Sequence, residues 1–252
     1  MKKIFYISLL FLGVTLFSEA ATRGDIKVIE ASENIRFLSQ KIVKDYLFFY
    51  KNQDKLEVKR GLERSLDKLN DDFRIIATTT KDEDTKDILE FLAYSKDQIE
   101  QMFNEEADKE RAALMLDYSE TLLEGADSIA NAHKYDFSDE EKMLMITKKI
   151  EYLLERVMKY YIAVHVGFNT PTNQEQMQKA INKIEESLVE ISLYNYPEEM
   201  KTVQNNLNQS WKENRAFFNK SDSLFIPKLM FTSVTYMTDM IDQIALYHSK
   251  NQ

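Results

Sequence analysis

The sequence has 252 residues, a formal net charge of −9 at pH 7 and hydrophobic residues at 44% of its positions. An acidic chain with dispersed lysines and arginines lacks a basic surface for nucleic acid, so we exclude nucleic-acid binding. The absence of cysteine excludes disulfides, thiolate metal sites and thiol nucleophiles. Only five glycines and three prolines occur, a composition that predicts long helices and an all-α fold.

The N-terminal residues have the pattern of a secretory signal. Two lysines precede an apolar run over residues 4–17, and Ser18, Glu19 and Ala20 place small residues where a signal peptidase cleaves. We therefore predict a signal peptide over residues 1–20, cleavage after about Ala20 and a periplasmic location. The apolar run is short for a bilayer span, and a retained N-terminal anchor is the alternative.

Four amphipathic segments follow, and each repeats its apolar residues at spacings of three and four, as one face of a helix does. The first covers residues 25–51, the second ends in threonines at 78–80, the third follows Asp82 as an N-cap, and the fourth ends near His133. The apolar residues of the four stripes are Ile35, Leu38, Ile42, Tyr46 and Phe49; Val58, Leu62, Leu66, Leu69, Phe73 and Ile76; Ile88, Leu92, Ile99 and Phe103; and Leu114, Tyr118, Leu122 and Ile129. Four helices joined by short loops predict an antiparallel bundle.

The pattern then begins again after a linker near residues 134–139. A shift of 115 residues aligns residues 35–133 with 150–248 without a gap and gives 18 identities over the 99 positions. We therefore predict two tandem antiparallel four-helix bundles, over residues 21–135 and 136–252. Identical pairs include Leu38/Leu153, Lys44/Lys159, Tyr46/Tyr161 and His133/His248.

The first helix contains a string that resembles a family signature, Asn34-Ile35-Arg36-Phe37-Leu38-Ser39-Gln40-Lys41-Ile42-Val43-Lys44-Asp45-Tyr46. It is similar to the opening helix of the PilJ-type sensor domain, the N-terminal domain of type IV pili methyl-accepting chemotaxis transducers. Five residues match that pattern, and Phe37 and Lys41 replace a methionine and an arginine. The matching residues are Arg36, Leu38, Ser39, Gln40 and Lys44. The resemblance implies a sensory domain, with the four-helix architecture that the related periplasmic domain of nitrate/nitrite sensor kinases also has.

The resemblance also implies a ligand site at Arg36, Ser39 and Gln40. In the nitrate/nitrite sensors an arginine that matches Arg36 faces its partner across a homodimer and holds a small planar anion, which suits a guanidinium fork. This chain departs from the pattern, because Glu33 replaces a family glycine and Glu151 matches Arg36 in the second copy. Since a carboxylate beside the site repels an anion, the alternative is a solvated or ion-paired surface arginine.

No catalytic, metal or cofactor site is expected. The three histidines, His133, His165 and His248, lie outside any metal-binding spacing, and the first and last of them end equivalent helices, where a cation is favoured. The sequence contains neither a glycine-rich phosphate loop nor a nucleophile elbow. We therefore expect a protein that is not an enzyme.

Aromatic residues gather in the first helix of each copy. Phe48 and Tyr50 lie off the main apolar stripe. They either pack within the chain or form a surface for a protein partner.

Two classes of function fit these patterns. The first is a stand-alone periplasmic sensory or ligand-binding module of PilJ type, for a small anion, that signals through a separate membrane receptor. The second is a structural or adaptor protein of the envelope that binds other proteins through its helical surfaces. In either class the chain forms a homodimer, or its two copies pack together as an intramolecular pseudo-dimer.

Overall fold

The computed structural model describes residues 23–220 and 225–251, and over these residues the chain is all-α, as predicted, with eight helices and no strand. The predicted signal peptide lies outside the described residues. Among the described helices, none combines the length and the apolar character that crossing a bilayer requires. The helices are α2 (Arg23–Lys51), α3 (Leu56–Thr79), α4 (Glu83–Phe103), α5 (Lys109–Ala132), α6 (Asp139–His165), α7 (Pro171–Leu193), α8 (Glu198–Phe218) and α9 (Pro227–Lys250).

Several helices begin at a residue whose side chain accepts a backbone N–H of the first turn. Asp82, Asp108 and Thr170 do so for α4, α5 and α7, which confirms Asp82 as an N-cap. Ser138 and Glu141 form a reciprocal capping box at the start of α6. These caps satisfy N–H groups that have no partner inside the helix, so the sequence defines where the helices begin.

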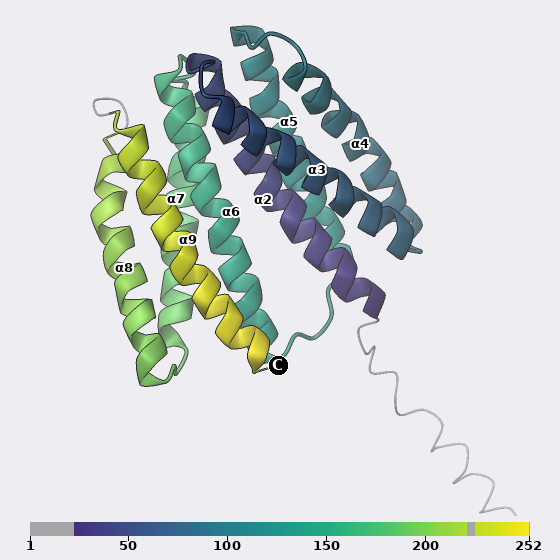
Figure 1. Cartoon of the computed structure of the whole chain (residues 1–252). Coiled ribbons are helices and arrows are strands. Elements are labelled where there is room, and N and C mark those ends of the chain that lie inside the picture. The colour runs from purple at the N-terminus through teal and green to yellow at the C-terminus, as the bar shows by residue number, and fades with distance from the viewer. Residues whose placement is uncertain (1–22, 221–224, 252) are drawn as a thin grey trace, which may run out of the picture.

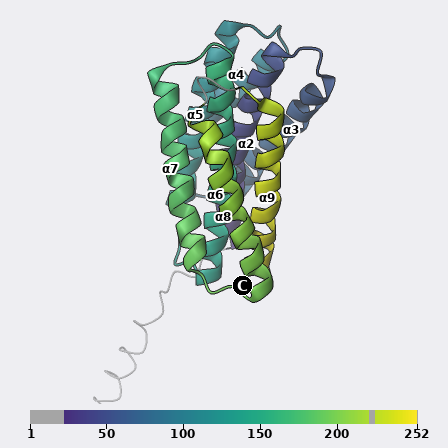
Figure 2. The same ribbon diagram turned by 90° about the vertical axis from the view of Figure 1, so that its left-hand side faces the viewer.

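The helices run alternately up and down and form two groups of four, α2–α5 and α6–α9 (Figure 1). Within each group, consecutive helices contact each other and the first helix contacts the fourth. The two groups meet where α2 packs against α6, so these two helices occupy the centre of the molecule (Figures 1 and 2). This arrangement is compatible with the predicted tandem bundles and places the two copies side by side.

The residues of the predicted apolar stripes lie in the core or pack against it, with one exception at the start of α5. Leu114 is 40% exposed, whereas Met115 and Leu116 are buried. The inward stripe of α5 is Ala112, Met115, Ser119, Leu122, Ala126 and Ile129, each three or four residues after the last. The predicted stripe therefore begins one residue too early, because small residues at three inward positions, Ala112, Ser119 and Ala126, make the true stripe less apolar than the neighbouring one.

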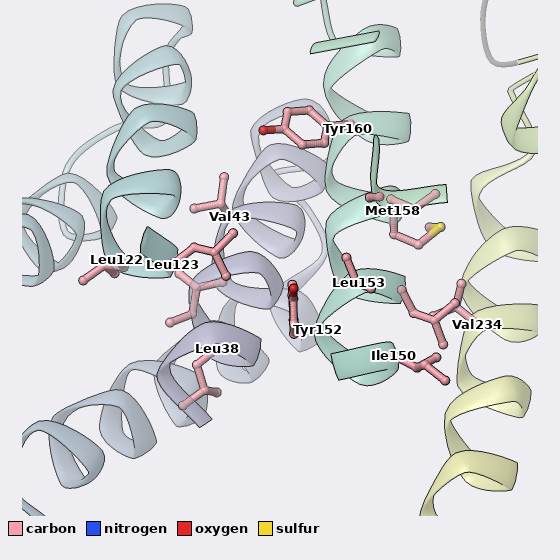
Figure 3. Packing of buried hydrophobic residues seen from close by; sticks show 14 of the residues in the cluster. Leu38, Val43, Leu122, Leu123, Ile150, Tyr152, Leu153, Met158, Tyr160 and Val234 are labelled. Atoms are coloured by element: carbon pink, nitrogen blue, oxygen red, sulfur yellow. The ribbon is translucent and has the colours of Figure 1, made fainter. Parts of the chain in front are cut away.

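The central helices are buried on more than one side. Residues 150–164 of α6 are buried with the single exception of Arg156. In Figure 3, Val43 of α2 faces Leu123 of α5, Ile150 of α6 lies toward Val234 of α9, and Tyr152 lies between α2 and α6. The core is consequently continuous from one helix group to the other.

Candidate functional site

A cavity of about 360 Å³ lies where the two helix groups meet, and we call it the junction cavity. Side chains of α2, α5, α6, α7 and the 133–138 connection form its walls. Four of them are basic and three are acidic, so the lining has a small excess of positive charge. The basic residues are Arg36, Lys134, Lys149 and Lys183, and the acidic residues are Glu33, Asp127 and Glu186.

Arg36 lies in the wall of the junction cavity and already has ionic partners. Its Nη1 is 2.6 Å from Oε1 of Glu33, its Nη2 is 3.4 Å from Oδ1 of Asp127, and its guanidinium carbon is 4.2 Å from the centre of the Tyr152 ring. The Nε–H is buried without a hydrogen-bond partner among the described residues. Arg36 is therefore ion-paired, as in the alternative drawn from the sequence, but its side chain is only 12% exposed and does not lie on the surface.

Burial makes Glu33 an unusual partner for this arginine. Burial raises the pKa of Glu33 above its ordinary value, although the positive charge of Arg36 opposes the shift. The carboxylate occupies one end of the guanidinium where an anionic ligand would otherwise bind.

Ser39 and Gln40, the other two predicted ligand-binding residues, lie on α2 outside the lining of the junction cavity. Both are fully buried. Ser39 Oγ donates to the Arg36 carbonyl, and Gln40 Nε2 donates to Ser39 Oγ and to the carbonyl of Ser119 on α5. These bonds join α2 to α5, so the structure brings neither residue to the cavity beside Arg36.

A second cavity, of about 350 Å³, lies between α2, α3 and α6, and we call it the acidic cavity. Glu33 lines both cavities and so separates them. Asp72, which is 6% exposed, accepts a hydrogen bond from Asn34 Nδ2 at 3.1 Å, and burial raises its pKa to about 6. Lys148 and Glu151, which lie 115 residues after Glu33 and Arg36, also line it and form an ion pair at 3.0 Å. The charges of this pair are reversed between the two copies.

Ion pairs between the two helix groups are buried beside α2 and α6. Lys44 Nζ lies 2.6 Å from Oε2 of Glu155, and Lys159 Nζ lies 2.5 Å from Oε1 of Glu120. Burial alone would lower the pKa of Lys44, but the carboxylates of Asp45 and Glu155 raise it above its ordinary value. For Lys159 burial prevails over Glu120 and lowers the pKa to about 8. Each of these equivalent lysines thus holds a carboxylate of the opposite group.

Each helix group also contains a histidine bound between a carboxylate and a hydroxyl. His133 Nδ1 is 2.8 Å from Asp25 Oδ1, and its Nε2 is 3.0 Å from Thr85 Oγ1. His248 likewise contacts Glu140 through Nδ1 and the Tyr196 hydroxyl through Nε2, at 2.7 Å. Because Thr85 and Tyr196 are buried, neither hydroxyl is accessible as a nucleophile, and the contacts tie together three elements in each group.

The histidine contacts also reveal a signal that the sequence analysis missed. In both groups the carboxylate precedes its histidine by 108 residues, so Asp25 and Glu140 are equivalent under the same shift of 115. The aligned residues 35–133 and 150–248 include neither acid. An alignment that starts ten residues earlier pairs Asp25 with Glu140.

Phe48 and Tyr50, the predicted alternatives for a partner surface, are both half-buried. The Phe48 ring packs edge-on against Phe231 of α9, with centroids 5.2 Å apart, so it contributes to the contact between the groups. The Tyr50 ring lies under Lys51 Nζ at 4.5 Å.

Among the described residues, no cluster of histidine and carboxylate side chains has the geometry to hold a metal ion. Comparison with family models, with curated proteins and with solved structures finds no match to this chain.

Proposed function

We propose that this chain is a non-enzymatic sensory or ligand-binding module that takes an anion in the junction cavity. The observation that carries the proposal is the basic lining of that cavity, to which Arg36, Lys134, Lys149 and Lys183 come from four different elements. Lysine and arginine are the side chains that bind anions through charge-assisted hydrogen bonds. The PilJ-type motif around Arg36 supports the same interpretation.

The position of the cavity suggests how binding would be transmitted. Its walls belong to both helix groups, so a ligand that contacts α2 on one side and α6 or α7 on the other favours one relative placement of the groups. A ligand shifts a conformational equilibrium only through such differential contacts. We propose that a separate membrane receptor or envelope protein reads the resulting change.

The proposal includes export to the periplasm, for which residues 1–20 provide the signal. N-terminal sequencing of the protein recovered from the cell envelope should give Ala21 as the first residue. Recovery of Met1 would contradict cleavage.

A thermal-shift screen with sodium salts of nitrate, nitrite, phosphate, acetate and benzoate, against equal sodium chloride, tests the proposal. At least one anion should raise the melting temperature in a concentration-dependent way, because a ligand that binds only the folded state stabilises it. A screen in which every anion behaves as chloride does would refute the proposed function.

A matched pair of variants locates the effect. Lys149→Gln with Lys183→Gln removes two charges from the cavity, whereas Lys142→Gln with Lys179→Gln removes two from exposed sites on the same helices, α6 and α7. The shift should disappear in the first variant and persist in the second. Equal loss in both would mean that the anion responds to net charge and not to the cavity.

The second candidate, an envelope adaptor, is favoured by the outer face of α4. Phe91 and Tyr94 are 65% and 59% exposed there, whereas the equivalent positions in the second copy are Asn206 and Gln209. Exposed aromatics among acidic residues suit a partner protein with a basic, partly apolar surface. A photo-crosslinking residue at Tyr94 should give one adduct of defined mass in cells, and the same residue at Gln209 should give none. Equal patterns at the two sites would reject this candidate.

A further inference from the structure

The size of the junction cavity constrains its ligand. Its volume of about 360 Å³ lies at the lower end of the range of small-molecule sites, about 300–1,000 Å³. A planar ion such as nitrate, with four heavy atoms, would fill only a small part of it. A ligand that excludes water from the cavity must therefore have a larger body.

The charges that remain free in the cavity are those of lysines. Arg36 is held by Glu33 and Asp127, as described above. Within the described residues, neither Lys134 nor Lys183 has a carboxylate within ion-pair distance, and Lys149 has only Glu190 at 4.0 Å. An incoming anion therefore meets ammonium groups without first displacing Glu33 from the arginine.

The rest of the wall is apolar. Ile29 and Tyr152 are buried, Met145, Ile146 and Phe137 are half-buried, and all five line the cavity. When a ligand covers apolar surface of this kind and removes it from water, the free energy of binding becomes more favourable. The three carboxylates of the lining disfavour a second or third negative charge on the ligand.

We propose that the junction cavity takes an organic monoanion with an apolar body, a carboxylate of about six to ten heavy atoms, with its charge on the lysines and its body against the apolar wall. This inference rests on the proposed function and specifies its ligand class. It differs from the small planar anion implied by the family resemblance, because Glu33 already occupies one end of the Arg36 guanidinium and the cavity is too large for such an ion to fill.

Isothermal titration calorimetry with the purified protein tests the ligand class. The probes are benzoate and hexanoate, with nitrate and acetate as anions that lack the body, and benzyl alcohol and benzylamine as bodies that lack the negative charge. Benzoate or hexanoate should bind at least tenfold more tightly than all four others. Lys149→Gln with Lys183→Gln should weaken that binding at least tenfold, and Lys142→Gln with Lys179→Gln should leave it within twofold.

The outcomes separate this inference from the proposed function. If nitrate or acetate binds as tightly as benzoate and hexanoate and depends on the cavity lysines, the ligand class is wrong and the anion-binding module stands. If benzyl alcohol binds as well as benzoate, the charge plays no part and the inference also falls. If none of the anions binds, both proposals are overturned. Circular dichroism of both double variants should give the wild-type helix content, which ensures that lost binding does not reflect unfolding.

Discussion

Glu33 is the residue that most changes what Arg36 can do. The PilJ-type pattern that the motif resembles has a glycine at this position. Here the Glu33 carboxylate lies 2.6 Å from the Arg36 guanidinium and is almost fully buried. A buried carboxylate is costly unless a cation compensates it, and the cation is costly without the carboxylate. Removing either charge would therefore leave the other buried without its counter-charge.

The first prediction concerns the coupling within this pair. Arg36→Met should lower the free energy of unfolding by about 3 kcal/mol, because it leaves Glu33 buried without its main counter-charge. Adding Glu33→Leu should restore most of that loss, since an apolar pair of similar volume removes both desolvation costs. Urea unfolding of the wild type, Arg36→Met, Glu33→Leu and the double variant measures the coupling.

The exposed pair Arg74 and Asp71 provides the control, with the same spacing of three residues and side chains 74% and 62% exposed. The corresponding Arg74→Met and Asp71→Leu cycle should give a coupling below about 1 kcal/mol. Equal coupling in the two cycles would show that burial of Glu33 and Arg36 has no energetic consequence.

The second prediction concerns the pH dependence of stability. The pKa of Asp72 is about 6 in the fold against an ordinary value of 3.8, so the folded chain retains a proton that the unfolded chain releases. The stabilisation is complete below about pH 4 and is lost as the pH rises through 6. Asp72→Asn keeps an acceptor for Asn34 and removes the charge, so it should raise the free energy of unfolding at pH 7 by about 2 kcal/mol.

Urea unfolding at pH 4, 5, 6 and 7 measures this effect. The difference between Asp72→Asn and wild type should grow across the series and level off above pH 6. Asp67→Asn, at an exposed position of the same helix, should run parallel to wild type. A constant offset between Asp72→Asn and wild type would contradict the shifted titration.

At the scale of the elements, the close packing of α4 on α5 depends on a glycine. A Cβ atom added to Gly125 would lie 2.5 Å from Cδ2 of Leu92, and Leu92 is fully buried and cannot move away freely. Gly61, in the second turn of α3, has no atom closer than 4.0 Å to such a Cβ. The two glycines therefore separate helix propensity from packing.

The third prediction compares alanine at these two sites. Gly61→Ala should raise the free energy of unfolding by up to about 1 kcal/mol, because alanine favours the helix. Gly125→Ala should lower it by about 1–3 kcal/mol, because overpacking exceeds the same gain. Thermal unfolding followed by circular dichroism measures both changes. A stabilising Gly125→Ala would mean that α4 is not packed against α5 at this position.

The sequence predicts most of the elements because their signals are local. Apolar spacing locates the inward faces, and Asp82 identifies a helix start through its own cap. Leu114 shows the limit of this reasoning, since apolar spacing cannot distinguish the face with Ala112 and Ser119 from the face one residue away. Which faces meet across the molecule depends on contacts between residues far apart in the chain.

At the scale of the whole molecule, the packing of α2 against α6 is the feature that sequence patterns could not settle. The side chains buried there include Lys44, Glu155 and Lys159, which an amphipathic pattern assigns to a solvated face. Their burial becomes understandable only when each is seen beside an opposite charge from the other helix group. Sequence patterns could not predict the junction cavity for the same reason, since Lys149 and Lys183 line it only when the two helix groups are packed together.

The fourth prediction follows from the continuous core across this contact. Trp211, the sole tryptophan, lies buried on α8, so its fluorescence reports on the second group alone. Leu69 is fully buried on α3 of the first group, and Leu69→Ala should cost about 2–5 kcal/mol. Because α2 and α6 share a core and buried ion pairs, the two groups should unfold together. Leu69→Ala should thus lower the urea midpoint of Trp211 fluorescence by as much as that of circular dichroism. Groups that unfold independently would instead leave the fluorescence midpoint at its wild-type value and split the circular dichroism curve into two steps.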